Sequence, residues 1–158
     1  MAFVWKWSVR LLGACLVLLL LFALYGGYAY RDHPLRDTEF SRGVSYFDIG
    51  PAEIAFRADG LDHGEKTPII LVHAMFFHMG MWDDWVSELA QHRPVYRFDV
   101  PGHGLSSLAE DGDYSLQSTM NVLQAFMDHQ GIDRAILVGA SMGGATLFNF
   151  AAEQPARV

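Results

Sequence analysis

Short apolar runs alternate with amphipathic segments from residue 44 to the end of the sequence. Ile69–Val72 and Ala135–Val138 are continuous apolar runs rich in β-branched residues, which is typical of strands buried on both faces of a parallel sheet. Val95–Phe98 is predicted as a further strand, and the turn at Gly50-Pro51 separates two more, Val44–Phe47 and Ala52–Arg57. The pattern therefore predicts five strands.

Apolar residues at helical spacing follow the last three of these strands. The predicted helical segments contain Trp82, Trp85, Val86 and Leu89; Leu116 to Met127, with Ser115 as N-cap and Gly131 after the end; and Ala145 to Ala152. Strands that alternate with helices imply right-handed crossovers and helices on both faces of a sheet. We therefore expect an α/β fold with a mostly parallel sheet.

The N-terminal region has a different pattern, because residues 11–30 contain no charged residue. A helix of that length spans about 30 Å, the thickness of the hydrocarbon core of a bilayer. Lys6 and Arg10 precede it without any acid, which favours a cytoplasmic N-terminus and a domain on the extracytoplasmic side. We predict a signal anchor at residues 1–30 and a linker at 31–43. A cleaved signal peptide and a buried soluble helix are the alternatives.

Charge and composition narrow the function classes for residues 44–158. The whole chain has a net charge of −7 and one cysteine, and half of its residues are apolar. All eighteen acids lie beyond residue 30, which argues against nucleic acid as a partner. One cysteine excludes a framework of internal disulfides. The high apolar share excludes a disordered chain. No spacing of ligand residues points to a metal, and we expect no cofactor.

A candidate nucleophile stands between the last predicted strand and the last predicted helix. Residues 139–143, Gly-Ala-Ser-Met-Gly, match the pattern G-x-S-x-G in the strand–turn–helix context that makes it informative. Small residues at Gly139 and Gly143 leave room for a tight turn that exposes Ser141. The N–H of Met142 would lie at the helix N-terminus, where donors are unpaired and can hold an oxyanion. The alternative is a glycine-rich turn with an incidental serine.

Two more motifs precede this turn. The strand ending at Val72 is followed by His73-Ala74, and the next strand by Asp99-Val-Pro-Gly-His103-Gly-Leu-Ser106. In this order the three motifs resemble the N-terminal half of the α/β-hydrolase fold family, of the AB hydrolase-1 type, over residues 44–158. The resemblance implies that Ser141 is the nucleophile and that the N–H groups of Met142 and Met75 form the oxyanion hole.

The resemblance also assigns roles to the neighbouring residues. His73, Asp99 and His103 are expected to shape loops around the site, and the apolar loop from Met75 to Phe77 is expected to line an acyl pocket. Trp82 and Trp85 are expected in the core. Ala74 stands where the family has glycine, and a positive φ there would strain the loop.

The remaining members of a catalytic triad are not evident. In this family the acid and the histidine follow the nucleophile in the chain, but only Glu153 and no histidine follow Ser141. The motifs also place 135–138 inside a sheet, with a strand on each side, and an unpaired apolar edge favours aggregation. We therefore expect the sequence to be a fragment that is inactive by itself.

Three functions remain open at this stage. The first is a membrane-anchored serine hydrolase that acts on a carboxylic ester or a similar small acyl substrate. The second is the same fold used for carbon–carbon bond hydrolysis or perhydrolysis. The third is a non-catalytic protein, either a degenerate copy or a membrane-tethered interaction module. The sequence does not identify the substrate or the oligomeric state.

Overall fold

The computed structural model describes residues 13–24 and 39–158, and the chain divides into two compact units, residues 1–41 and 42–158. Residues 13–24 are helical. No helix in the described ranges combines the length and the apolar character that crossing a bilayer requires. The predicted anchor extends outside the described residues on both sides, at 1–12 and 25–30, as does most of the predicted linker. The membrane anchor therefore stays a prediction.

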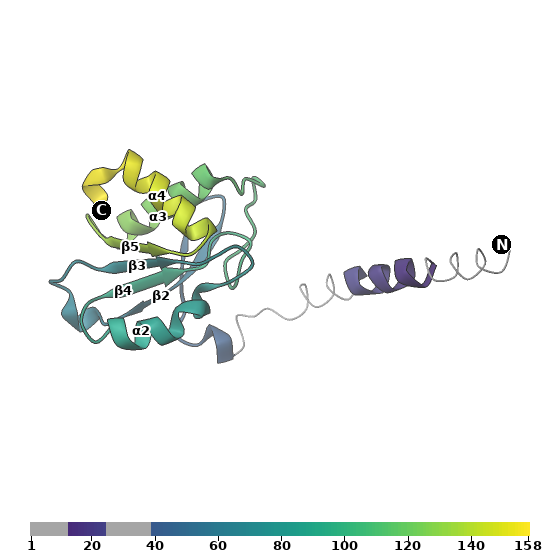
Figure 1. The fold of residues 1–158 in the computed structure, drawn as a ribbon, viewed down its shortest axis with the longest axis horizontal. Coiled ribbons are helices and arrows are strands. Elements are labelled where there is room, and N and C mark those ends of the chain that lie inside the picture. The colour runs from purple at the N-terminus through teal and green to yellow at the C-terminus, as the bar shows by residue number, and fades with distance from the viewer. Residues whose placement is uncertain (1–12, 25–38) are drawn as a thin grey trace. The chain divides into compact units, whose positions relative to one another are not determined.

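The second unit is built on a sheet of five strands (Figure 1). Their order across the sheet is β1-β2-β4-β3-β5. Their bounds are β1 (Ser45–Asp48), β2 (Glu53–Asp59), β3 (Ile69–Val72), β4 (Val95–Phe98) and β5 (Ile136–Gly139). All five lie within two residues of the predicted positions, because turn residues in the sequence mark where the strands begin and end.

The sheet is mixed, so the prediction of a mostly parallel sheet needs correction. β3 runs parallel to β4 and to β5, whereas β2 is antiparallel to both β1 and β4. For β1 and β2 the physical reason is the short turn between them, where the N–H of Ile49 donates to the carbonyl of Ala52 (3.0 Å). A turn this short joins only antiparallel neighbours, while parallel neighbours need a long crossover.

Helices cover both faces of the sheet, as predicted (Figure 1). The helices α3 (Leu116–His129) and α4 (Met142–Glu153) share one hydrophobic cluster with Ile70, Val72 and Phe98. The short helix η4 (Met79–Trp82) and α2 (Asp83–Leu89) pack on the opposite face against Ile69, Leu71 and Val95. Successive strand residues thus face opposite layers. Three further 3-10 turns are η2 (Glu39–Ser41), η3 (Leu61–His63) and η5 (Pro155–Arg157).

Two local expectations have opposite outcomes. Ser115 caps α3 as predicted, because its side chain accepts a hydrogen bond from the N–H of Ser118 (3.1 Å). The prediction of a buried Trp85 is wrong: Trp82 is 6% exposed, but Trp85 is 56% exposed. The two rings make a T-shaped contact, with 5.7 Å between their centroids.

The described sheet ends at β5. This strand pairs with β3 alone, and its first residue, Ile136, is 41% exposed. Because β3, β4 and β5 are parallel, their carboxyl ends lie at one edge of the sheet, where the three sequence motifs therefore meet.

Candidate active site

Ser141 occupies a strained turn between β5 and α4. Its backbone has φ 50° and ψ −114°, a combination that few residues other than glycine adopt. Its side chain makes no capping hydrogen bond to α4, and the residue is exposed. The turn therefore presents a hydroxyl group that no local hydrogen bond occupies, as expected of a nucleophile.

Two glycines make this turn sterically possible. A Cβ atom on Gly139 would lie 2.6 Å from the carbonyl carbon of Gly143, and one on Gly143 would overlap the Val72 carbonyl oxygen and lie 2.8 Å from that of His73. The start of α4 therefore lies directly against the ends of β3 and β5. This is the close approach that the sequence pattern predicted.

The helix start also provides a donor for an oxyanion. Met142 is the first residue of α4, where an N–H has no acceptor within the helix. Its neighbours are engaged: the N–H of Gly143 donates to Ala140 (2.9 Å) and that of Ala145 to Ser141 (3.0 Å). The positive end of the helix dipole further favours negative charge at this point.

The second expected donor, Met75, lies on the loop after β3. The strain that a positive φ would cause at Ala74 is not present. In the described chain the non-glycine residues with positive φ are Phe76 (φ 66°) and Ser141. The carbonyl of Ala74 accepts hydrogen bonds from Nδ1 of His73 (2.8 Å) and from the N–H of Phe77 (3.1 Å). The strain of this loop therefore falls on Phe76, one residue after the expected donor.

His73 shapes this loop and is not available as a base. The side chain is fully buried. Since the Ala74 carbonyl can only accept, Nδ1 carries the proton, and Nε2 accepts from the N–H of Val100 (3.1 Å). Burial lowers the pKa of His73, outweighing the bond to the Ala74 carbonyl, which raises it. The ring is therefore neutral with both nitrogens in use, in line with the loop-shaping role that the resemblance implied.

Asp99 holds two loops together. Its fully buried carboxylate accepts from the N–H of Met79 through Oδ1 (2.6 Å) and from that of Leu105 through Oδ2 (2.8 Å). Gly104 has φ +51°, and a Cβ there would overlap the carboxylate. Ser106 Oγ donates to the Asp99 carbonyl (2.6 Å) and accepts from the N–H of Ala55 (2.9 Å). The side chains of the motif at 99–106 thus hold neighbouring segments of the chain in place.

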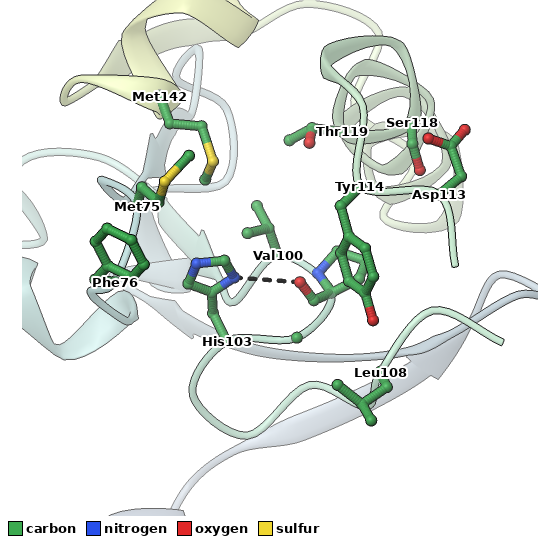
Figure 2. Close-up of a pocket in the computed structure, with 12 residues that line it drawn as sticks. Met75, Phe76, Val100, His103, Leu108, Asp113, Tyr114, Ser118, Thr119 and Met142 are labelled. Carbon is green, nitrogen blue, oxygen red and sulfur yellow. Dashed lines mark hydrogen bonds between the residues drawn. The ribbon is translucent and has the colours of Figure 1, made fainter. Parts of the chain in front are cut away.

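An apolar pocket of about 270 Å³ lies beside Met142 and the loop after β3 (Figure 2). Its lining consists of Met75, Phe76, Val100, Pro101, Gly102, His103, Leu108, Asp113, Tyr114, Ser118, Thr119 and Met142. The expected acyl-pocket loop contributes Met75 and Phe76 but not Phe77. Ser141 is not in the lining, although Met142 beside it is. The pocket therefore brings the two expected oxyanion residues to one cavity.

Sequence reasoning missed the far wall of this pocket. Leu108 and Tyr114 lie between β4 and α3, and Ser118 and Thr119 are in the first turn of α3. The available signal was their place in the segment that joins the Gly-rich loop to α3 and in the first turn of that helix. His103 lies between the two walls (Figure 2) and donates from Nδ1 to the carbonyl of Pro101 (3.2 Å). Its ring centroid is 5.1 Å from that of His73.

No base contacts the serine within the described residues. None of their histidines or carboxylates is hydrogen-bonded to Ser141. Glu153 is the last of the 12 residues of α4, so about 18 Å of helix separates it from the serine. In this part of the chain the geometry therefore provides an exposed serine and one helix-terminal donor, without a group that could activate the serine.

Comparisons with known proteins agree with this architecture. A family model described as the alpha/beta hydrolase fold matches residues 67–158. The chain is 40% identical over 93 residues to the dihydrolipoyllysine-residue acetyltransferase component of an acetoin cleaving system from Pseudomonas putida, covering 58% of this chain and 25% of that protein. It is 34% identical over 100 residues to a 2-hydroxy-6-oxo-2,4-heptadienoate hydrolase from Pseudomonas putida, covering 61% and 36%.

A solved structure shows the same arrangement. The enol-lactonase of Burkholderia xenovorans superposes with a TM-score of 0.66 at 31% identity, over 72% of this chain and 44% of that one. The chain thus spans 25% and 36% of the two curated relatives and less than half of the enol-lactonase. Together with the elbow at Ser141 and the mixed sheet, the match over residues 67–158 shows that this chain belongs to the alpha/beta hydrolase fold family.

Proposed function

We propose that this chain carries the nucleophile of a serine hydrolase that cleaves a carboxylic ester or a similar acyl substrate. The observation that carries the proposal is the strained, exposed Ser141 at the N-terminus of α4. Strain of this kind persists only where surrounding structure enforces it, and it is concentrated at functional sites. Here the close packing of Gly139 and Gly143 enforces it.

The reaction would proceed through an acyl-enzyme. Oγ of Ser141 attacks the acyl carbonyl carbon, and the N–H groups of Met142 and Met75 stabilise the resulting oxyanion. The tetrahedral intermediate then collapses, the C–O bond to the alcohol breaks, and the alcohol leaves with a proton. Water releases the acid in a second, equivalent step.

Ser141 needs a base to take its proton. Among residues 13–24 and 39–158 no base is hydrogen-bonded to Ser141, and both nitrogens of His73 are in use. In this family an acid and a histidine follow the nucleophile. We therefore propose that the activating pair comes from outside these 158 residues and that the chain alone is inactive.

The pocket lining favours an uncharged acyl group. Met75, Phe76, Val100, Leu108 and Met142 provide apolar surface, and no lysine or arginine is among the twelve lining residues. A substrate carboxylate would therefore find no lysine or arginine to pair with in this pocket. This observation favours an ester over an anionic substrate of carbon–carbon hydrolysis. The identity to a 2-hydroxy-6-oxo-2,4-heptadienoate hydrolase keeps that second reaction as the competing candidate.

We also propose that the uncharged segment at residues 11–30 anchors the domain to a membrane on its extracytoplasmic side. The two bases before this segment support that orientation. Extraction of the native protein at alkaline pH tests the proposal. An anchored protein stays in the membrane pellet, and release into the supernatant would contradict the anchor.

Ester hydrolysis by the native protein tests the catalytic proposal. A chromogenic ester should give a burst of product followed by slower turnover, and Ser141→Ala should lower kcat by about 10³-fold or more. Ser118→Ala is the matched control, because this hydroxyl also borders the pocket but is not at the elbow. Undiminished turnover in Ser141→Ala would overturn the assigned role. Parallel assays with a β-diketone separate ester from carbon–carbon hydrolysis.

A further inference from the structure

The loop that carries the proposed donor Met75 is held at both ends. At its start, His73 bonds the Ala74 carbonyl and the N–H of Val100. At its end lies Met79, whose side chain is 2% exposed. Between these fixed points the chain passes through Phe76, the strained residue with φ 66°. The direction of the Met75 N–H therefore depends on where the two ends are held.

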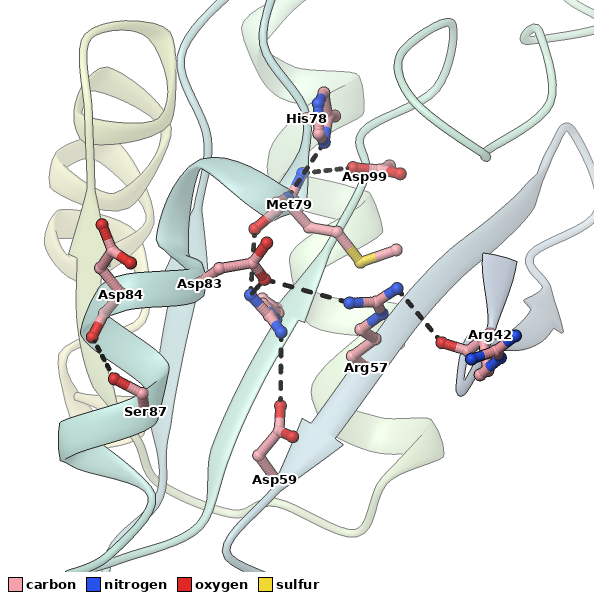
Figure 3. Close-up of polar contacts among 11 residues, drawn as sticks. Arg42, Arg57, Asp59, His78, Met79, Asp83, Asp84, Ser87 and Asp99 are labelled. Carbon is pink, nitrogen blue, oxygen red and sulfur yellow. Dashed lines mark hydrogen bonds and ion pairs between the residues drawn. The ribbon is translucent and has the colours of Figure 1, made fainter. Parts of the chain in front are cut away.

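Both polar groups of the Met79 peptide segment are bound by residues of one region, β4 and its end (Figure 3). Its N–H donates to Oδ1 of Asp99 (2.6 Å), and its carbonyl accepts from the guanidinium of Arg97 (3.5 Å). Asp99 belongs to a motif that the sequence had singled out, whereas Arg97 does not. Arg97 nevertheless contacts the same residue from the other side.

Arg97 is an unusual core residue. It is 4% exposed and lies on the α2 face of β4, next to an apolar cluster that includes Leu71 and Val95. Its guanidinium lies 2.5 Å from Oδ1 of Asp83, the first residue of α2, and 3.7 Å from Oδ2 of Asp59, the last residue of β2. One cation thus links β2, the Met79 carbonyl and the start of α2.

Arg97 is buried, but the carboxylates that it contacts are not: the side chains of Asp83 and Asp59 are 61% and 39% exposed. Ion pairs with exposed carboxylates give little net stability. Removing a cation from water is costly, and an apolar side chain of similar size is often as stable or more so. A guanidinium differs from an apolar side chain in directing several N–H groups in fixed geometry. Here these groups fix the backbone at residue 79 and the start of α2. A methionine at position 97 could fill the same space but could not hold the backbone at residue 79 or the start of α2.

We infer that Arg97 is a positioning residue for the oxyanion hole: by holding the Met79 carbonyl and Asp83 it fixes the path of residues 74–79 and aims the N–H of Met75. This inference rests on the proposed function. The residue touches neither substrate nor Ser141. It acts through the loop, and releasing one end allows Phe76 to relax from its strained conformation.

Hydrogen exchange and kinetics of the native protein test this role. In Arg97→Met, the amides of residues 74–79 should exchange at least tenfold faster, with those of β3 and β4 unchanged. The kcat for a chromogenic ester should fall about tenfold at nearly constant KM, because oxyanion contacts strengthen in the transition state. Arg97→Lys keeps the charge but lacks the fixed geometry of the guanidinium N–H groups. It should restore part of the exchange protection and part of kcat.

Arg57→Met is the matched control. Arg57 lies 3.9 Å from the same Asp83 and donates to the carbonyl of Arg42 (3.2 Å), so the variant removes a cation from the same cluster (Figure 3). Exchange at 74–79 and kcat should both stay at wild-type values.

The outcomes separate the inference from the proposed function. Wild-type exchange and kcat in Arg97→Met would overturn the positioning role, as would equal effects in Arg57→Met. If Arg97→Met does not fold, Arg97→Lys and Asp83→Asn replace it, and unchanged exchange and kcat in both overturns the role. Absence of ester turnover in wild type would count against the proposed function, while exchange at 74–79 would still decide whether Arg97 holds the loop.

Discussion

Polar residues follow three parallel strands at one edge of the sheet, and they serve two different purposes. After β3 and β4, His73 and Asp99 are fully buried, and every side-chain nitrogen or oxygen of the two has a partner. After β5, Ser141 is exposed and caps nothing. The first two hold loops together through their side chains. The third is held entirely by its backbone, which leaves its hydroxyl group available.

This difference distinguishes the residues at this edge that stabilise loops from the residue whose side chain is free to react. A buried polar group without partners is costly, so structural residues are those with complete hydrogen bonding. A nucleophile must keep its reactive atom accessible, so its side chain cannot be held by hydrogen bonds. Its backbone then has to be fixed by the packing of the glycines two residues before and after it. The following substitutions test this distinction, from the largest expected effect to the smallest.

The glycine packing at the elbow should be the least tolerant feature. In Gly143→Ala the new Cβ overlaps the Val72 carbonyl oxygen, which forces α4 away from β3 and should lower the free energy of unfolding by about 3 kcal/mol or more. Gly144→Ala is the control, since its Cβ lies 3.3 Å from the Gly139 carbonyl oxygen. Urea denaturation measures both. Equal stability of the two variants would show that backbone packing does not hold the elbow.

Removal of the Asp99 carboxylate comes next. Asp99→Ala leaves the N–H groups of Met79 and Leu105 buried without acceptors, and we expect a loss of about 2–4 kcal/mol. Asp128→Ala removes an exposed carboxylate that lies 2.9 Å from Arg157, and should cost about 1 kcal/mol or less. Thermal unfolding of both variants tests the assignment. A loss of stability in Asp99→Ala no greater than in Asp128→Ala would rule out a structural role for the Asp99 carboxylate.

The buried His73 should make stability depend on pH. Burial lowers its pKa in the folded state below the ordinary value of 6.5, so below pH 6.5 the unfolded chain binds a proton that the native chain disfavours. This contribution to the free energy of unfolding is fully present above pH 6.5 and is lost as the pH falls below that value. Unfolding free energies of wild type and His73→Gln at pH 7.5 and 5 measure it. An equal decrease in both would contradict a neutral His73.

The smallest effects concern the loop backbone. Phe76→Gly relieves a positive φ on a side chain that is 90% exposed, and the gain is offset by the greater entropy of the unfolded chain, so stability should change by less than about 1 kcal/mol. Ala74→Gly has no strain to relieve and should cost about 0.5–1 kcal/mol. Chemical denaturation compares them. A gain in Ala74→Gly above that in Phe76→Gly would place the strain at residue 74.

The sequence was sufficient for features that depend on local pattern. The strands, the Ser115 cap and the elbow glycines each follow from residues that are close together in the chain, and the structure has them where expected. The loop roles of His73 and Asp99 came from the family resemblance. The structure supports these roles by showing the hydrogen-bond partners of both side chains.

Features that depend on distant residues could not be predicted. The antiparallel pairing of β2 with β4 depends on where β2 joins the sheet, and the exposure of Trp85 depends on how α2 packs on it. Arg97 looked like an ordinary strand residue, because its partners Asp59 and Asp83 are separated from it by 38 and 14 positions in the sequence. The location of backbone strain at Phe76 rather than Ala74 likewise follows from bonds made only in the folded loop.

The central claim is that Ser141 is the nucleophile, and peptide mapping after reaction with a fluorophosphonate tests it most directly. The native protein should gain one adduct, located on the peptide that contains Ser141, and Ser141→Ala should gain none while Ser118→Ala still reacts. An adduct on another residue, or full ester turnover with no adduct at Ser141, would contradict the account.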